Sequence, residues 1–391
     1  MIYLDYNATT PIDPRVAEAM QPFLREEYGN PSSQHPVGQR ARQAMEKARE
    51  EVAALLGCGA SEVVFTSGGS ESNNMVIQGV VHAYRGQARH IITTQMEHPA
   101  VLEPCRHLES QGVEVSYVAV DGQCLVDPDA VKKALRPETI LITVMHANNE
   151  VGTIQPIAEI GKIAREAGAL FHTDAAQSMG KIPARVEDLG VDFLTVAGHK
   201  LYAPKGVGAL YIRQGISLEP LIHGAGQEGG RRAGTESPLL AVGLGTACRL
   251  AGEGLDEDVP RIRGLRDRLY QGLLEHVPKL VLNGHPETRL PNTLNVSFPG
   301  AVGSEVLAEL DGVCASTGSA CHEGSTEISP VFRAMGVAEE VALGAVRFSL
   351  GRWTTQEEVD EVVQAVGAWA EKRARERTLW GRLKRFLGGK R

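Results

Sequence analysis

The chain has 391 residues, of which 42% are apolar and 23% are charged. It can therefore bury a large core, and its length favours two domains over one. The net charge of -8 gives the surface no general attraction for nucleic acid. The opening residues lack a basic segment followed by an apolar one, and no apolar run is long enough to cross a bilayer. We expect neither a signal peptide nor membrane association.

The six cysteines are scattered along the chain, and none of them forms a CxxC pair. This pattern predicts free thiols in a reducing, cytoplasmic compartment. Cys321 and His322 are adjacent, and no Cys/His set has the spacing of a zinc site. We therefore expect no metal site.

Strand-like apolar runs alternate with amphipathic helical segments over the first 245 residues. Strands are predicted at 62–66, 90–94, 113–120, 140–145, 168–173, 192–196 and 208–212, and helices at 39–57, 99–111, 129–135 and 157–167. This alternation predicts an α/β fold whose mostly parallel sheet is covered by helices on both faces.

The pattern changes after about residue 245. Long charged helices, predicted at 255–276 and 355–387, flank shorter strands near "TLNVSF" and "AVRFSL". We expect a smaller α+β domain here. The predicted boundaries are 14–245 for the large domain, 1–13 together with 246–375 for the small domain, and 376–391 for a basic tail.

Polar residues follow several of the predicted strands, where open parallel sheets bind their ligands. They are Gly69 and Ser70 in "SGGSESNN", His98, Asn149, Asp174, Gln177, His199 and Lys200. A glycine-rich turn at a helix start suits a phosphate. A lysine amine can form a Schiff base, and an aspartate can keep a pyridine nitrogen protonated. Each feature alone has a structural explanation, such as a turn or a helix cap, but their order and placement favour a site for pyridoxal 5'-phosphate (PLP).

The sequence also resembles the cysteine desulfurases of the class V aminotransferase group, which are fold-type I PLP enzymes. The resemblance runs from "YLDYNATTP" to "RFSLGRWTT", over nearly the whole chain. The other matching stretches are "GNPSS", "TSGGSESNN", "MEHPAV", "HANNEVGTIQPI", "HTDAAQS", "GHKLYAPKGVGALY", "GAGQEGGRRAGTES" and "STGSAC".

The resemblance implies a role for each candidate residue. Lys200 would be the Schiff-base lysine, Asp174 the partner of the ring nitrogen and Gln177 the partner of the phenolate oxygen. His98 would stack on the ring and carry protons. The phosphate would be held by Gly69, Ser70 and His199, with Thr235 reaching across a dimer interface. Asn149 and Arg347 would bind the substrate carboxylate, which a planar guanidinium suits.

Two positions depart from the family pattern. Ala197 stands where the family usually has a serine whose hydroxyl binds the phosphate, and Ala203 replaces a glycine that is often found there. One phosphate hydrogen bond should therefore be missing, and we expect weaker retention of PLP.

Two cysteines lie in "CASTGSACHEGSTEISP". Cys314 ends a small apolar run, which is typical of a buried small residue. Cys321 lies in a stretch of Gly, Ser, Thr and Glu that predicts a loop. The resemblance implies that Cys321 forms the persulfide. However, "CHEG" followed by "SPV" is also similar to selenocysteine lyases of the same superfamily, so a second substrate stays open.

We expect a homodimeric PLP enzyme that converts L-cysteine to L-alanine. Its persulfide would pass to an iron–sulfur scaffold or another sulfur-acceptor protein. The alternatives are a selenocysteine lyase or another class V PLP lyase, or a PLP-bearing scaffold or delivery subunit that mainly docks a partner. Residues 372–391 carry nine Lys/Arg and one Glu. This tail is predicted to dock an acidic partner or anionic surface, or else to pack on its own domain.

Overall fold

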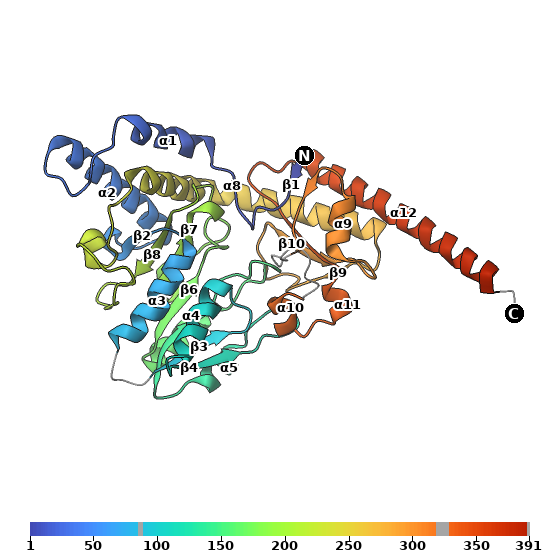
Figure 1. The fold of residues 1–391 in the computed structure, drawn as a ribbon, viewed down its shortest axis with the longest axis horizontal. Coiled ribbons are helices and arrows are strands. Elements are labelled where there is room, and N and C mark those ends of the chain that lie inside the picture. The colour runs from blue at the N-terminus through green and yellow to red at the C-terminus, as the bar shows by residue number, and fades with distance from the viewer. Residues whose placement is uncertain (85–88, 318–327, 389–391) are drawn as a thin grey trace.

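The computed structural model describes residues 1–84, 89–317 and 328–388, with side chains described as far as residue 376. Its larger sheet has seven strands in the order β2-β8-β7-β6-β5-β3-β4 (Figure 1). Neighbouring strands are parallel from β7 to β4, whereas β8 is antiparallel to both β7 and β2. The predicted α/β fold with a mostly parallel sheet is therefore confirmed. The strands are β2 (Val63–Thr66), β3 (His90–Thr94), β4 (Glu114–Val118), β5 (Thr139–Thr143), β6 (Leu170–Asp174), β7 (Phe193–Ala197) and β8 (Gly208–Ile212).

Helices cover both faces of this sheet, so successive strand residues are apolar. Ile92 and Leu194 contribute to one buried cluster, and their neighbours Ile91 and Phe193 contribute to another. Successive side chains of a strand point to opposite faces, so both faces need apolar residues. The helices of this part are α1 (Pro14–Arg25), α2 (Pro36–Leu56), α3 (Gly69–Ala83), α4 (Pro99–Glu109), α5 (Pro128–Ala134), α6 (Ile157–Ala167) and α7 (Val186–Leu189).

The C-terminal part has its own small sheets and its own core. Strand β10 (Thr293–Ser297) lies between β12 (Ala345–Ser349) and β9 (Val281–Leu282), and all three are antiparallel. Strand β1 (Ile2–Tyr3) pairs with β11 (Val313–Cys314) in parallel. The helices are α9 (Gly303–Glu309), α10 (Pro330–Ala334), α11 (Glu339–Ala342) and α12 (Gln356–Gly388).

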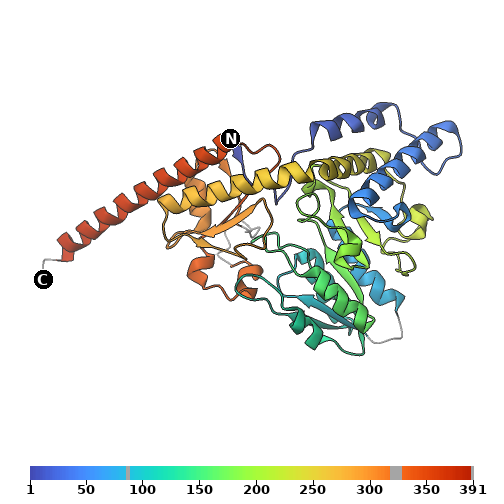
Figure 2. The same ribbon diagram turned by 180° about the vertical axis from the view of Figure 1, so that it is seen from behind.

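Helix α8 (Pro238–His276) runs along both parts of the molecule (Figure 2). Leu244 and Cys248, near its start, pack in a core of the larger sheet, whereas Leu269 and Leu273 pack in the core of the C-terminal part. The predicted domain boundary at residue 245 lies inside this helix. The division into domains stays a prediction.

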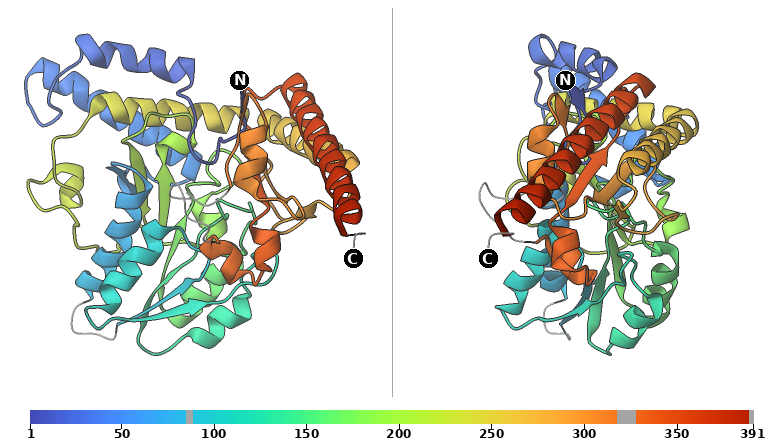
Figure 3. Two further views of the ribbon diagram at one scale, coloured as in Figure 1. Left: turned by 45° about the vertical axis from the view of Figure 1, so that its right-hand side comes forward. Right: turned by 90° about the vertical axis from the view of Figure 1, so that its right-hand side faces the viewer.

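Helix α12 packs on the C-terminal part with its first turns and then projects from the body (Figures 1 and 3). Val359, Val366 and Trp369 are buried in the core there. The side chains beyond residue 376 lie outside the description, so the docking role of the basic tail stays a prediction. None of the helices in the described ranges combines the length and apolar character needed to cross a membrane.

The N-terminal segment connects the two parts at the edge where the parallel strands end. Asp5 forms a bridge with Ser349 of β12, and the Thr10 amide donates to the carbonyl of His199, just after β7. The residues that follow β2, β3, β5, β6 and β7 meet at this edge. Residues far apart in the sequence therefore meet at one place.

Close packing of α8 on α2 gives a stability prediction with a control on the same helix. A Cβ added to Gly245 would lie 2.7 Å from the Cα of Ala48, whereas one added to Gly264 would meet nothing within 4 Å. Gly245→Ala should destabilise the protein by about 1–3 kcal/mol through overpacking. Gly264→Ala should stabilise it by up to about 1 kcal/mol, because alanine is the better helix former. Urea unfolding followed by circular dichroism measures both, and a Gly245→Ala protein as stable as the wild type would contradict the packing.

Candidate active site

A cavity of about 720 Å³ opens at the carboxyl edge of the larger sheet. It gathers residues from five strand ends, from the N-terminal segment and from β12. The predicted residues that line it are Gly69, Ser70, His98, Asn149, Asp174, Gln177, His199, Lys200 and Arg347. The structure thus brings together side chains that the sequence separates by almost 280 residues, from Gly69 to Arg347.

One end of the cavity is the start of helix α3. Its first residue is Gly69, and the preceding Gly68 has φ of 150° and provides no side-chain cap. Gly68 also approaches β8 closely, since a Cβ added to Gly208 would lie 2.7 Å from the Gly68 Cα. The first N–H groups of a helix have no partner within the helix, and the helix dipole favours an anion there. This end of the cavity suits a phosphate.

Ala197 ends β7 beside the same helix start. It is buried, and a Cβ added to Gly69 would lie 3.4 Å from its methyl carbon. A hydroxyl at position 197 would therefore lie next to the first turn of α3. The site has an apolar methyl where a further donor to an anion would fit.

Lys200 lies just after β7, in the short 3-10 turn Gly198–Lys200. Its Nζ donates to the carbonyl oxygens of Asn7 and Ala8, the latter at 2.7 Å. Burial and the charge of Arg347 lower the pKa of Lys200, while Asp5 and Asp174 act in the opposite direction, and the result is a pKa of about 8. A lysine with this pKa has a much larger fraction of neutral, nucleophilic amine near neutral pH than an ordinary lysine.

His199 and His98 also line the cavity. The Nδ1 atom of His199 lies 3.2 Å from the hydroxyl of Thr9. Burial, reinforced by the charge of Lys200, lowers the pKa of His199 to about 4, so its ring is neutral at pH 7. His98 caps α4, and its Nδ1 accepts from the Ala100 amide at 3.1 Å. With Nδ1 as the acceptor, Nε2 carries the proton of a neutral ring.

Asp174 ends β6 with a buried carboxylate. Its Oδ2 accepts from Asn73 at 2.6 Å, and its Oδ1 accepts from the Ala176 amide at 2.9 Å. Two polar donors hold this carboxylate in one orientation at the cavity wall. A protonated ring nitrogen is the kind of partner that a fixed carboxylate stabilises.

Arg347, on β12, brings a guanidinium into the cavity. Its two terminal nitrogens donate to the Asn149 carbonyl and to Asp5 Oδ1, both at 2.8 Å. Its buried Nε has no hydrogen-bond partner among the described residues. The backbone carbonyl of Asn149 accepts from Asn7 and Arg347, and its side-chain amide has no hydrogen-bond partner within the described part of the chain. An arginine with a spare buried donor suits a carboxylate ligand.

Two buried acids beside predicted residues were missed by the sequence analysis. Burial raises the pKa of Glu97 to about 8, although it accepts from Thr94 and from the Met145 amide. Burial raises the pKa of Glu150 to about 7, and it accepts from Ser329 at 2.6 Å. Glu97 directly precedes His98, and Glu150 directly follows Asn149. Nothing in the sequence indicates that these two acids are buried.

Among the described residues, Thr235 is the predicted residue that does not line this cavity. Thr235 is exposed and lines a separate cavity of about 220 Å³ with Thr66 and Arg232. Its predicted contact with a second subunit stays a prediction. Cys321 lies outside the described residues. Cys314 is half-buried in β11.

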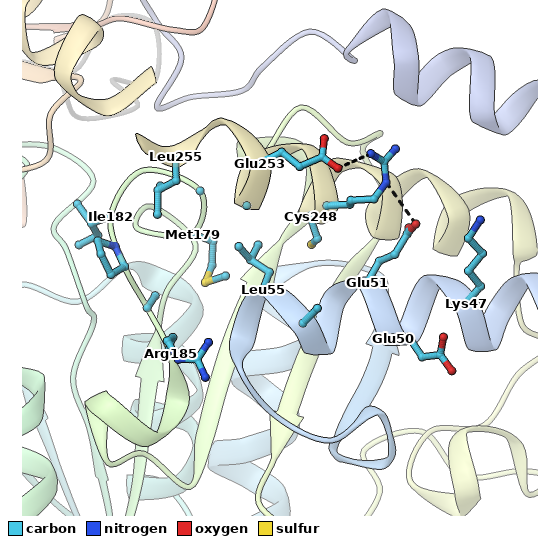
Figure 4. Close-up of a pocket in the computed structure, with 16 residues that line it drawn as sticks. Lys47, Glu50, Glu51, Leu55, Met179, Ile182, Arg185, Cys248, Glu253 and Leu255 are labelled. Atoms are coloured by element: carbon cyan, nitrogen blue, oxygen red, sulfur yellow. Dashed lines mark hydrogen bonds and ion pairs between the residues drawn. The ribbon is translucent and has the colours of Figure 1, made fainter. Parts of the chain in front are cut away.

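Another cavity, of about 570 Å³, lies between α2, α8 and residues 179–185 (Figure 4). Leu55, Met179 and Cys248 give it an apolar floor. On its rim, Arg249 is paired with Glu51 and Glu253. It contains none of the predicted site residues, so the chemistry belongs to the cavity around Lys200.

The pKa of Lys200 gives a prediction for the protein without added cofactor. An acylating reagent should modify Lys200 with a midpoint near pH 8, where an ordinary lysine, with a pKa of about 10.4, is almost fully charged. Arg347→Met should raise this midpoint, because removing a positive charge favours the protonated amine. Peptide mass spectrometry across pH measures the labelling, with exposed Lys205 as the internal reference. A wild-type midpoint at the ordinary lysine value would contradict the geometry.

Comparisons with known proteins agree with these features. The family model Aminotransferase class-V matches residues 2–362. The "Cysteine desulfurase IscS" of Dictyoglomus turgidum is 50% identical over 95% of both chains, and that of Anaeromyxobacter dehalogenans is 48% identical over 94% of this chain and 91% of the relative. A solved NifS-like protein matches with a TM-score of 0.89 and 41% identity, over 95% of this chain and 99% of its own. A structure of SspA in complex with cysteine matches with a TM-score of 0.80 and 38% identity, over 91% of this chain and 100% of the SspA chain. The chain belongs to the class V aminotransferase family and, within it, to the cysteine desulfurases.

Proposed function

We propose that the protein is a PLP-dependent cysteine desulfurase that converts L-cysteine to L-alanine. The observation that carries the proposal is the half-buried amine of Lys200, whose pKa is about 8, in one cavity with an uncapped helix start and a fixed carboxylate. The curated relatives named cysteine desulfurases support the same assignment. The C–S bond of cysteine breaks, the carbon takes a proton, and the sulfur joins an enzyme thiol to form a persulfide. This conversion needs no external oxidant or reductant.

The residues present fit PLP. The start of α3 at Gly69 and Ser70, with His199, would hold the phosphate, and Asp174 would hold the ring nitrogen. Gln177 would donate to the phenolate oxygen, and His98 would cover the ring. When bound, PLP withdraws electrons from the substrate carbon next to the amine.

The protein's own side chains would bind the substrate and move its protons. Arg347 and Asn149 would hold the carboxylate of cysteine. Neutral Lys200 would take the proton from the α-carbon, which requires an amine with a lowered pKa. Neutral His98 would carry a proton at Nε2.

Cys321 would accept the sulfur and pass the persulfide to an iron–sulfur scaffold or another acceptor protein. Thr235 would contribute to the phosphate site of a second subunit in a homodimer, in keeping with its exposed position outside the cavity. A selenocysteine lyase is the competing candidate, supported by the "CHEG…SPV" pattern around the same cysteine.

The position of Ala197 predicts the effect of adding the missing hydroxyl. Ala197→Ser should slow the loss of PLP, because one hydrogen bond to a charged group is worth about 1.5–3 kcal/mol. Dialysis of the two loaded proteins, followed by absorbance, measures the loss. Ala203→Gly changes the other departing position without adding a donor and serves as the control. Equal or faster loss from Ala197→Ser would count against this placement of the phosphate.

The choice of thiol can be tested with two variants and two substrates. Cys321→Ala should bind PLP normally but lose sulfide release from L-cysteine, because binding uses Lys200 and Asp174 rather than the thiol. It should keep some activity on L-selenocysteine, since a selenolate is the better leaving group. Cys314→Ala, the matched control, should change either activity much less.

The assay measures alanine and the released sulfide or selenide for each combination of protein and substrate. Mass spectrometry of the peptides that contain Cys314 and Cys321 follows brief exposure to substrate. Wild-type protein that forms no alanine from cysteine would reject the proposed function. Full desulfuration by Cys321→Ala, or a persulfide on Cys314, would reject the choice of thiol.

A further inference from the structure

Lys181 is a second lysine at the active site, and neither the sequence analysis nor the reaction described above gives it a role. It follows the turn after β6, four residues beyond Gln177. Its Nζ donates to Gln177 Oε1 at 3.0 Å and to Asn7 Oδ1 at 3.4 Å. Lys181 therefore contacts a residue that lines the cavity without lining it itself.

The chemistry of its partners fixes the orientation of the Gln177 amide. An ammonium group can only donate hydrogen bonds, so Lys181 requires the oxygen of the amide. The backbone carbonyl of Asn7 can only accept, and it receives the Gln177 Nε2 at 3.0 Å. The assignment of oxygen and nitrogen, which is often ambiguous for a glutamine, is determined here by both neighbours.

This orientation leaves one donor for a ligand. The amide nitrogen carries two hydrogens, and the Asn7 carbonyl uses only one of them. Without Lys181, the Asn7 carbonyl alone would select this orientation. The turned-over amide, whose oxygen would repel a negatively charged ligand atom, would then be less strongly disfavoured.

The charge of Lys181 is costly at this position. Burial, together with the charges of the nearby cations Lys200 and Arg347, lowers the pKa of Lys181 to about 7. No carboxylate contributes to the pKa shift of Lys181, and the groups that hold its Nζ are neutral amide oxygens. A negatively charged ligand near Lys181 and Arg347 would offset this cost.

We propose that Lys181 is a positioning residue that holds the Gln177 amide so that its free N–H points to the phenolate oxygen of bound PLP. The inference rests on the proposed function, because it requires PLP in the cavity. The competing explanation is that Lys181 only ties the N-terminal segment to the body through Asn7.

Equilibrium binding of PLP to the cofactor-free protein separates these explanations without measuring activity. Lys181→Met should weaken binding about tenfold, which corresponds to about 1.4 kcal/mol, and Lys181→Arg should restore most of it. On a Gln177→Ala background, Lys181→Met should have little further effect, because the two residues act as one unit. A PLP analogue without the ring hydroxyl should bind wild type and Lys181→Met alike.

The binding measurements separate failure of the proposed function from failure of the inference about Lys181. If wild-type protein does not bind PLP, the proposed function fails, and the inference fails with it. If wild type binds and Lys181→Met binds equally well, only the inference fails. Additive losses in the double variant, or an equal loss with the analogue, would show that Lys181 has a purely structural role. If Lys181→Met does not fold, Lys181→Gln replaces it. The new amide at position 181 can either donate or accept, so it no longer dictates the orientation of the Gln177 amide. This variant must also bind PLP more weakly than wild type.

Discussion

Asn7 is bonded to both parts of the molecule at once, and the active site depends on that connection. Its backbone amide donates to Ser349 and its side-chain amide to Thr293, both in the C-terminal part. Its carbonyl accepts from Lys200 and Gln177, in the part that contains the larger sheet. A buried asparagine with all these partners satisfied is a rigid connector, because breaking any one bond leaves a buried polar group unpaired. The Lys200 amine is therefore positioned by a residue almost two hundred positions earlier in the chain.

The same connection explains the electrostatics of the cavity. Lys200, Lys181 and Arg347 lie close enough that each of the lysines has its pKa lowered by a neighbouring cation as well as by burial. Asp5, which pairs with Arg347, partly offsets this lowering for Lys200 and brings a counter-charge from the N-terminal segment. A site that combines a guanidinium with an amine of lowered pKa is suited to an anionic cofactor and an amino-acid substrate.

The sequence predicted the strands and most helices of the larger sheet correctly, because strands buried on both faces produce continuous apolar runs between clear turns. It predicted α8 to begin at 255, whereas the helix begins at Pro238. The first turns of α8 are rich in glycine and small apolar residues, and lack the charged periodicity of an exposed helix. Gly245 shows why, because α2 packs directly against its backbone. Local composition could not reveal that contact.

Some residues of the candidate site could likewise be predicted from the sequence, and others could not. Glycine turns and polar residues at strand ends were visible in the sequence, and the family resemblance supplied their roles. Lys181, Asn7 and the buried acids Glu97 and Glu150 were not visible, because their importance depends on partners brought close only by the fold. Their signals in the sequence are those of ordinary polar residues.

The most direct test of this account is the site of covalent attachment of PLP. The protein is mixed with PLP, reduced with borohydride, digested and examined by mass spectrometry. The account predicts that the cofactor is attached to Lys200 and that Lys200→Ala carries no attachment. Attachment to Lys181 or Lys205 in the wild-type protein, or unchanged attachment in Lys200→Ala, would contradict it.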